Sequence, residues 1–91
     1  MHGEYKTPGG KLIVADLDVR DGKLTNVEVS GDFFLDPPEA LEDIVGALED
    51  APADLSEEAY AARVQDALGP DVEMLGFSAE AVARAVKRAL L

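Results

Sequence analysis

Apolar and polar residues alternate along two neighbouring stretches near the start of the chain. In residues 11–19, every second position is apolar: Ile13, Ala15, Leu17 and Val19. In residues 24–30, the side chains expected to point inward are Thr25, Val27 and Val29. A period of two is typical of a β-strand. Asp21 and Gly22 lie between the stretches and favour a tight turn, because glycine adopts positive φ at little cost. We therefore predict an antiparallel hairpin.

The aromatic residues gather just after this hairpin. Residues 32–35 read Asp-Phe-Phe-Leu, which predicts a short third strand. In an extended run Phe33 and Phe34 point to opposite sides, so one of them is expected to lie outside the core.

Three later stretches have the periodicity of amphipathic helices. The expected N-caps are Asp36, followed by Pro37 at the first helical position, then Ser56 and Ser78. The apolar stripes are Leu41, Ile44, Val45 and Leu48, then Tyr60, Val64, Ala67 and Leu68, and finally Val82, Val86, Ala89 and Leu90. The cations expected to complement the dipole near the end of the last helix are Arg84, Lys87 and Arg88.

Strands followed by helices, without alternation, predict an α+β fold. We expect a small antiparallel sheet of about three strands, the hairpin plus the short third strand, covered by about three helices. A length of 91 residues fits a single domain, 1–91. Residues 1–10 are rich in glycine and polar side chains, and we expect them to form a mobile segment ahead of the sheet.

The charge of the chain restricts its partners. Nineteen acidic and eight basic side chains give a net charge of −11. Such a chain repels phosphate backbones and anionic lipids, so we expect neither nucleic acid nor membrane as a partner. The acidic shell either keeps the protein soluble or steers it toward a basic partner. Without cysteine, an apolar leader or a long apolar run, a cytoplasmic location is expected.

Residues for catalysis or metal binding are scarce. The chain has one histidine, His2, which belongs to the expected mobile segment, so no nucleophile–base pair is predicted. The acidic residues do not follow the spacing of a calcium loop. We therefore predict no catalytic residue and no metal site.

The segment 6–11, KTPGGK, is the most unusual in the chain. Paired glycines let a backbone approach a ligand closely, and the two lysines bring positive charge to an acidic protein. The spacing is not that of a phosphate-binding P-loop. Two interpretations of this segment remain at this point: a flexible lead into the sheet, or a contact with a partner. Residues 32–34 likewise fit either core aromatics with a capping Asp32 or an aromatic docking patch.

Four segments taken together resemble the accessory domain of lipoate-protein ligases. They are residues 5–12 (YKTPGGKL), 18–24 (DVRDGKL), 29–34 (VSGDFF) and 36–41 (DPPEAL), and the later LGFS of residues 75–78 is similar to that family as well. The resemblance covers nearly the whole chain, in the stand-alone small-subunit form. It implies a fold similar to SufE-like and NifU-like proteins.

The resemblance also implies a function. In that family a catalytic subunit activates lipoate with ATP to lipoyl-adenylate and lipoylates a lysine of an acceptor protein. This chain would be a non-catalytic accessory subunit that binds the catalytic subunit, and it would not be active alone. Lipoate, ATP and Mg would belong to the partner complex, with none bound by this chain alone. Further partners would be lipoyl acceptor domains, or a second copy when the chain is isolated.

The same resemblance points to contact residues near the partner's active site. The residues expected there are Lys6, Pro8, Gly9, Gly10 and Lys11, and then Asp32, Phe33 and Phe34. An alternative function, based on the net charge, is an acidic protein-binding adaptor of another pathway without enzymatic role.

Overall fold

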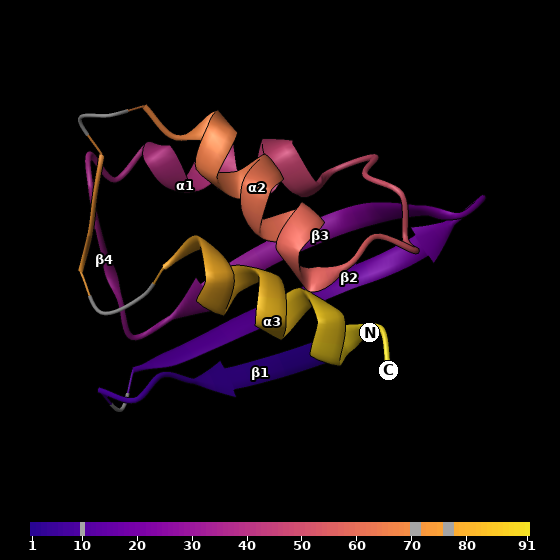
Figure 1. The fold of residues 1–91 in the computed structure, drawn as a ribbon, viewed down its shortest axis with the longest axis horizontal. Helices are drawn as coiled ribbons and strands as arrows, with labels where there is room; N and C mark the ends of the chain where they lie inside the picture. Colours follow the sequence, from indigo (N-terminus) through magenta and orange to yellow (C-terminus); the bar gives the residue numbers. More distant parts are fainter. Residues whose placement is uncertain (10, 70–71, 76–77) are drawn as a thin grey trace.

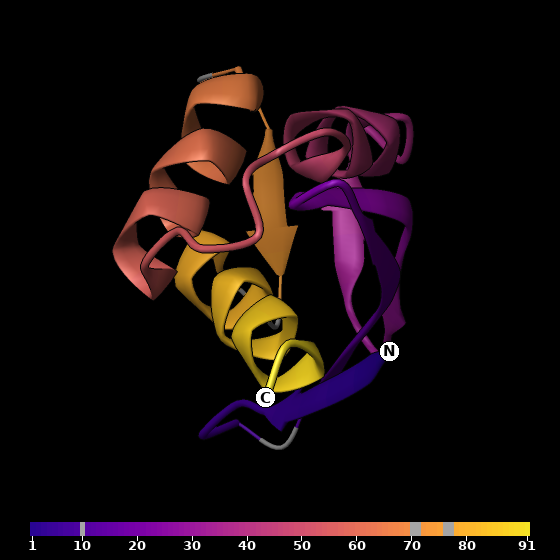
Figure 2. The ribbon, with the colours of Figure 1, turned by 90° about the vertical axis from the view of Figure 1, so that its right-hand side faces the viewer.

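The computed structural model describes residues 1–9, 11–69, 72–75 and 78–91, and for Phe34 and residues 73–75 the backbone alone. The α+β fold is confirmed. Strands β1 (His2–Lys6), β2 (Leu12–Arg20) and β3 (Lys23–Gly31) form an antiparallel sheet in the order β1-β2-β3. Helices α1 (Ala40–Leu48), α2 (Glu57–Ala67) and α3 (Ala79–Ala89) lie together on one side of this sheet (Figures 1 and 2).

The third strand of the sheet differs from the predicted one. It is β1, from the segment expected to lie ahead of the sheet, and it pairs with β2 from His2↔Asp16 to Lys6↔Leu12. The run expected to supply the third strand instead contains β4 (Phe34–Asp36), which pairs with β5 (Glu73–Leu75) in a separate two-stranded sheet. The main sheet ends near Gly31, whose φ of +147° is open to glycine and rare for other residues.

The β2–β3 hairpin forms as predicted, with one change of register. Asp21 and Gly22 both have positive φ, as a two-residue hairpin turn requires. Between Asp16 and Asp18 the pairing shifts, opposite Asn26, which has a φ of +51°. This bulge reverses the alternation, so Leu24 is buried and Thr25 is half-exposed. The prediction that Thr25 points inward was therefore wrong.

Two of the three predicted helix starts are confirmed. The hydroxyls of Ser56 and Ser78 each accept a hydrogen bond of 3.1 Å from the N–H three residues later. The first helix begins at Ala40 instead of Pro37, and Asp36 is not its N-cap but the last residue of β4. Pro38 explains this difference, because a residue that precedes proline is disfavoured in the helical conformation.

The core lies between the helices and one face of the sheet. Its largest fully buried side chains are Ile13, Leu24, Ile44, Leu48, Tyr60, Val64, Val82 and Val86. Helix α3 packs against β1 and β2, and α2 packs against both α1 and α3. The phenol of Tyr60 donates a hydrogen bond of 2.6 Å to the carbonyl of Pro52, which satisfies its polar atom within the core. None of the described helices has the length and apolar content that crossing a lipid bilayer requires.

Candidate functional site

The two segments that the sequence singled out meet at one end of the main sheet. Lys6 pairs with Leu12 across β1 and β2. On its other side, the carbonyl of Leu12 accepts a hydrogen bond of 2.9 Å from the N–H of Asp32. Leu12 of β2 therefore lies between the two segments. The segment 6–11 is on one side of it, and the segment that begins at Asp32 is on the other. We call this region the turn end of the sheet, comprising Lys6, residues 7–9, Lys11, Leu12 and Asp32.

The turn between β1 and β2 is closed by its own hydrogen bonds. The N–H of Thr7 donates to the carbonyl of Lys11 at 2.8 Å, and the N–H of Lys11 donates back to the Thr7 hydroxyl at 3.2 Å. Pro8 and Gly9 form its exposed tip, and a Cβ at Gly9 would meet no other atom within 4 Å. Gly10, the other glycine of the predicted contact segment, lies outside the described residues.

A pocket of about 480 Å³ separates this turn from the start of α3. The residues that line it from the sheet side are Tyr5, Thr7, Pro8, Gly9 and Lys11, and those from the helix side are Glu57, Ser78, Glu80, Ala81 and Arg84. The structure therefore brings Pro8, Gly9 and Lys11 of the predicted contact residues to one cavity. Lys6 and Asp32 lie at the same end of the sheet but outside this lining.

Two arginines of α3 lie close to the ring of Tyr5, and one of them, Arg84, lines one wall of the pocket together with that ring. The guanidinium carbons of Arg84 and Arg88 each lie 5.1 Å from the ring centroid, within cation–π range. Arg84 also donates to Glu57 of α2, with Nε–Oε1 and Nη2–Oε2 distances of 3.3 Å. The hydrogen bonds and charge of Glu57 raise the pKa of Arg84. The wall is therefore an electrostatic link between β1, α2 and α3.

Sequence reasoning missed this wall. It assigned Arg84 and Arg88 to the dipole of the last helix, whereas the structure shows that each also contacts a neighbouring element. Lys87 behaves in the same way, because its ammonium donates to the carbonyl of Leu55 at 3.0 Å. The available signal was the spacing of Arg84 and Arg88, four residues apart and therefore on one helix face.

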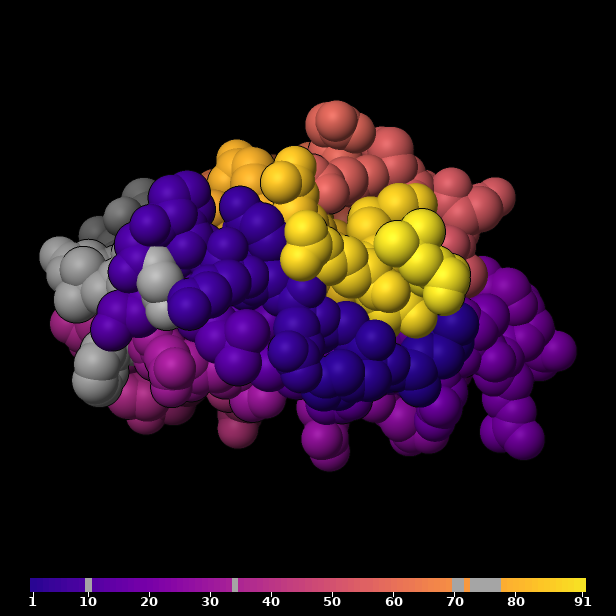
Figure 3. All heavy atoms as spheres, turned by 90° about the horizontal axis from the view of Figure 1, so that it is seen from below, coloured from indigo at the N-terminus to yellow at the C-terminus, as the bar shows by residue number. Residues whose placement is uncertain are grey.

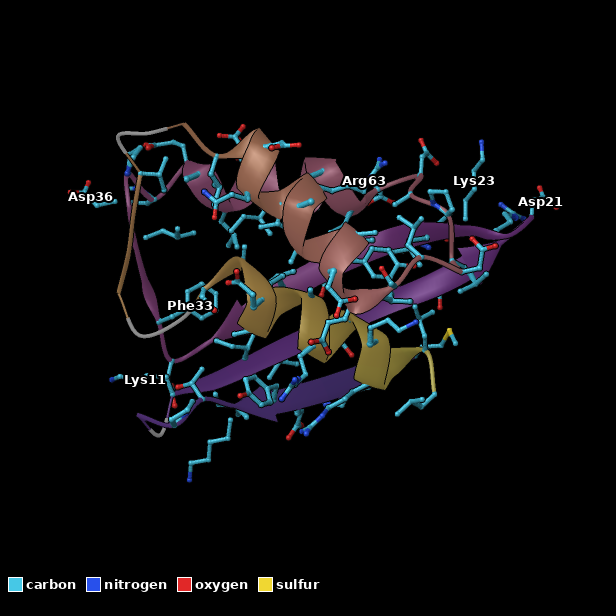
Figure 4. The ribbon with its side chains drawn as sticks, viewed as in Figure 1. Lys11, Asp21, Lys23, Phe33, Asp36 and Arg63 are labelled. Carbon is cyan, nitrogen blue, oxygen red and sulfur yellow. The ribbon has the colours of Figure 1, made fainter. Side chains whose placement is uncertain are left out.

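Two lysines at the turn end have no such partner. The side chains of Lys6 and Lys11 are exposed, and no hydrogen bond or ion pair with another described residue engages either ammonium. By contrast, Arg63 donates to the carbonyl of Ala47 at 3.1 Å. In Figure 4, Lys11 points away from the body of the molecule. The turn end therefore presents positive charge that is not neutralised within the described structure.

Of the two adjacent phenylalanines, Phe33 has its side chain within the described structure. Phe33 is half-buried against the hydrophobic core, and Figure 4 shows its ring on the helix side of the sheet. The side chain of Phe34 lies outside the described residues. Asp32 is exposed beside Leu12. The expectation that one of the two rings lies outside the core stays a prediction, and it now concerns Phe34.

His2 lies away from the pocket, on the open face of the sheet. Gly3 and Tyr5 face α3, so the alternating side chains of His2, Glu4 and Lys6 face the opposite way. Both ring nitrogens of His2 are engaged, Nε2 by Glu4 and Nδ1 by Asp16, each at 2.6 Å. The hydrogen bonds to Glu4 and then to Asp16 raise the pKa of His2. Within the described ranges, no group of three or more acidic or histidine side chains is arranged to hold a metal ion.

Comparison with known proteins adds one relationship to this geometry. Neither a family model nor a curated protein matches the sequence. The fold, however, matches a chain in the solved structure of an archaeal lipoylation system from Thermoplasma acidophilum, which contains a bipartite lipoate protein ligase and its E2 lipoyl domain. The TM-score is 0.68 at 22% identity, and the match covers 100% of this chain and 98% of that chain. This chain has the fold of a component of that system.

Proposed function

We propose that this chain is the non-catalytic accessory subunit of a bipartite lipoate-protein ligase. The observation that carries the proposal is the structural match, which spans 100% of this chain and 98% of the related one. The related chain belongs to a system whose ligase is divided between two parts. The match therefore extends over nearly the full length of that related chain.

In this proposal the chemistry takes place on the partner. The catalytic subunit would use ATP, with Mg, to convert lipoate to lipoyl-adenylate, and would then transfer the lipoyl group to a lysine of an acceptor protein. The chain's one histidine supports this division, because His2 lies on the open face of the sheet with both ring nitrogens bound to carboxylates. The accessory subunit would act by holding the catalytic subunit in a conformation that forms the adenylate.

The turn end of the sheet is the proposed contact with the catalytic subunit. Lys6 and Lys11 supply charge that the described residues leave unpaired, and Pro8 and Gly9 supply an exposed backbone beside the pocket. The large apolar side chains exposed among the described residues are Met1, Val19 and Leu91, none of which belongs to the turn end. We therefore expect a polar contact in which the lysines meet carboxylates of the partner, and we expect added salt to weaken it.

Pyrophosphate release tests the proposal directly. The lipoate ligase catalytic subunit from the same organism is assayed with ATP and lipoate, with and without this chain. We expect lipoate-dependent pyrophosphate release to increase when the chain is present, and the chain alone to release none. Equal rates with and without the chain would refute the proposal. Binding without any change in rate would instead favour the alternative of a protein-binding adaptor.

A further inference from the structure

The two edge strands of the main sheet, β3 and β1, differ in whether their outward-facing backbone groups are hydrogen-bonded. The outer edge of β3 is covered along its first half by the connection between α1 and α2. The N–H of Leu24 donates to the carbonyl of Ala51 at 2.9 Å, and the carbonyl of Leu24 accepts from the N–H of Asp50 at 2.8 Å. The N–H of Val27 donates to a carboxylate oxygen of Glu49 at 3.2 Å. Backbone groups that face outward from this part of β3 therefore have partners.

The outer edge of β1 lacks this cover. The N–H of Leu17 donates to the carbonyl of Met1, and the N–H of Thr7 donates to the carbonyl of Lys11. Directly opposed residues of an antiparallel pair alternate between bonded and non-bonded positions. In the observed register, the odd residues from Met1 to Thr7 therefore direct their backbone groups toward β2. His2, Glu4 and Lys6 direct theirs away from it.

Among these outward groups, one has a partner in the described structure. The carbonyl of Glu4 accepts a hydrogen bond of 3.0 Å from Arg88 Nη1. The amides of Glu4 and Lys6 and the carbonyl of Lys6 have none within the described residues. Figure 3 shows the first residues, in indigo, as a continuous surface on this side of the molecule, with yellow α3 beside them. An edge of this kind is a template for an added strand.

We propose that the open edge of β1 binds an extended segment of the lipoate ligase catalytic subunit as a fourth strand of the sheet. This inference rests on the proposed function. The added strand would run past the turn end, where Lys6 and Lys11 carry unpaired charge. An acidic side chain opposite Lys6 would complete the pairing, because opposite charges stabilise directly facing positions of neighbouring strands. Main-chain hydrogen bonds would supply much of the affinity in such a contact.

The charges on β1 argue against a second copy of this chain as the occupant. If two β1 edges paired antiparallel over their full length, Glu4 would face Glu4 of the other copy, and Lys6 would face His2. The ring nitrogens of His2 are already engaged by Glu4 and Asp16, so His2 offers no free acceptor to Lys6 of the other copy. Like charges that face each other directly destabilise a strand pair. The sequence of β1 therefore disfavours this dimer and favours a partner with different charges.

Amide hydrogen exchange tests the inference without any substitution. Exchange rates are measured by NMR on the isotope-labelled chain, free and in the presence of the unlabelled catalytic subunit. We expect the amides of Glu4 and Lys6 to exchange at least tenfold more slowly in the complex, because each gains a carbonyl partner. The amides of Gly3 and Tyr5, which face β2, serve as internal controls and should be protected in both states.

A matched pair of variants gives an independent measurement. Glu4→Pro removes the outward N–H, and an edge strand tolerates proline at a position whose N–H faces away from the sheet. Glu4→Ala removes the same carboxylate but keeps the N–H. We expect the proline variant to raise the Kd for the catalytic subunit at least tenfold above that of the alanine variant. Retained protection of Gly3 and Tyr5 would show that the proline variant is folded.

The outcomes separate this inference from the proposed function. A complex that leaves the Glu4 and Lys6 amides as exposed as in the free chain would overturn the edge contact and keep the accessory role. Failure of the catalytic subunit to bind at all would overturn both. Protection of the two amides in the free chain at high concentration would assign the edge to a second copy and overturn the inference. Protection by a lipoyl acceptor domain, and not by the catalytic subunit, would also overturn it.

Discussion

Gly3 of β1 lies directly against Ala85 of α3, with no room for a side chain between them. A Cβ built on Gly3 would overlap the carbonyl oxygen of Ala85 and the amide nitrogen of Ala89. Both obstructing atoms belong to the helix backbone, which cannot rotate away as a side chain can. The glycine therefore allows α3 to pack closely on the edge strand and keeps β1 in the sheet.

Replacing Gly3 with alanine should test this close approach. We expect Gly3→Ala to lower the free energy of unfolding by about 1–3 kcal/mol, the usual cost of adding a methyl group to a packed contact. Gly46→Ala is a matched control, because a Cβ at Gly46 in α1 meets nothing within 4 Å. That substitution should instead stabilise the protein by about 0.5–1 kcal/mol, because alanine is the better helix former. Urea unfolding measures both, and an unchanged midpoint for Gly3→Ala would contradict the packing described.

Removing the ammonium of Lys11 should affect function and spare the fold. Lys11 is exposed and its ammonium makes no hydrogen bond or ion pair with a described residue, so Lys11→Ala should change stability by less than about 0.5 kcal/mol. If Lys11 meets a carboxylate of the catalytic subunit, the substitution should raise the Kd for that subunit about tenfold, which corresponds to a loss of ~1.4 kcal/mol of binding free energy. Titration calorimetry with that subunit measures the effect.

Lys23→Ala is the control for this experiment. Lys23 is also exposed, but Figure 4 shows it near the hairpin turn, at the end of the molecule opposite Lys11. Its removal should leave binding unchanged. Equal losses from the two substitutions would show that net charge, and not the turn end, determines the affinity.

The contact between Arg84 and Glu57 should contribute little to stability. The two side chains are 48% and 31% exposed, and ion pairs of this exposure are typically worth less than about 1 kcal/mol. A double-mutant cycle with Arg84→Met and Glu57→Gln measures the coupling free energy. We expect a value below about 1 kcal/mol that decreases as salt is added. A larger, salt-independent value would mean that the pair is more buried in solution than its exposure indicates.

Stability should also depend on the protonation of His2. The hydrogen bonds to Glu4 and Asp16 raise its pKa in the folded chain above the ordinary value of 6.5. The folded state therefore binds the proton more tightly than the unfolded state. The resulting stabilisation is present in full below about pH 6.5 and is lost as the pH rises through the folded pKa. His2→Gln should remove this dependence.

Two measurements check the His2 prediction. Thermal unfolding of the native chain should show a falling midpoint as the pH rises above about 6.5, and the His2→Gln variant should lack this component. An NMR titration reads the pKa directly, because the chain has a single histidine. If the NMR titration gave a His2 pKa at or below the ordinary value of 6.5, the two carboxylates would not stabilise the imidazolium in solution.

The elements that the sequence predicts well are those encoded by neighbouring residues. The Asp21-Gly22 turn and the serine N-caps of α2 and α3 depend on a few adjacent positions, and all of them form as expected. The place of β1 could not be predicted in this way. Two of its residues face α3, and one of them is Gly3, a residue type that is depleted in strands. Its position becomes clear only when α3 is placed against it.

The same distinction applies to the site. The unusual composition of residues 6–11 was visible in the sequence, and the structure places its described residues at one end of the sheet. The opposite wall of the pocket was not visible, because Glu57 and Arg84 are 27 positions apart on different helices. The register shift that exposes Thr25 was missed for a related reason. A bulge depends on the pairing of two strands, and the alternation within one strand does not reveal it.

The contact between β1 and α3 also affects how the chain folds. Arg88 donates to the carbonyl of Glu4, 84 positions earlier, so β1 is held by a helix that lies far from it in the sequence. Until α3 has been synthesised, the inner faces of Gly3 and Tyr5 have nothing to pack against. Because this contact joins residues far apart in the sequence, we expect it to form late in folding, and we expect the protein to unfold in one cooperative transition.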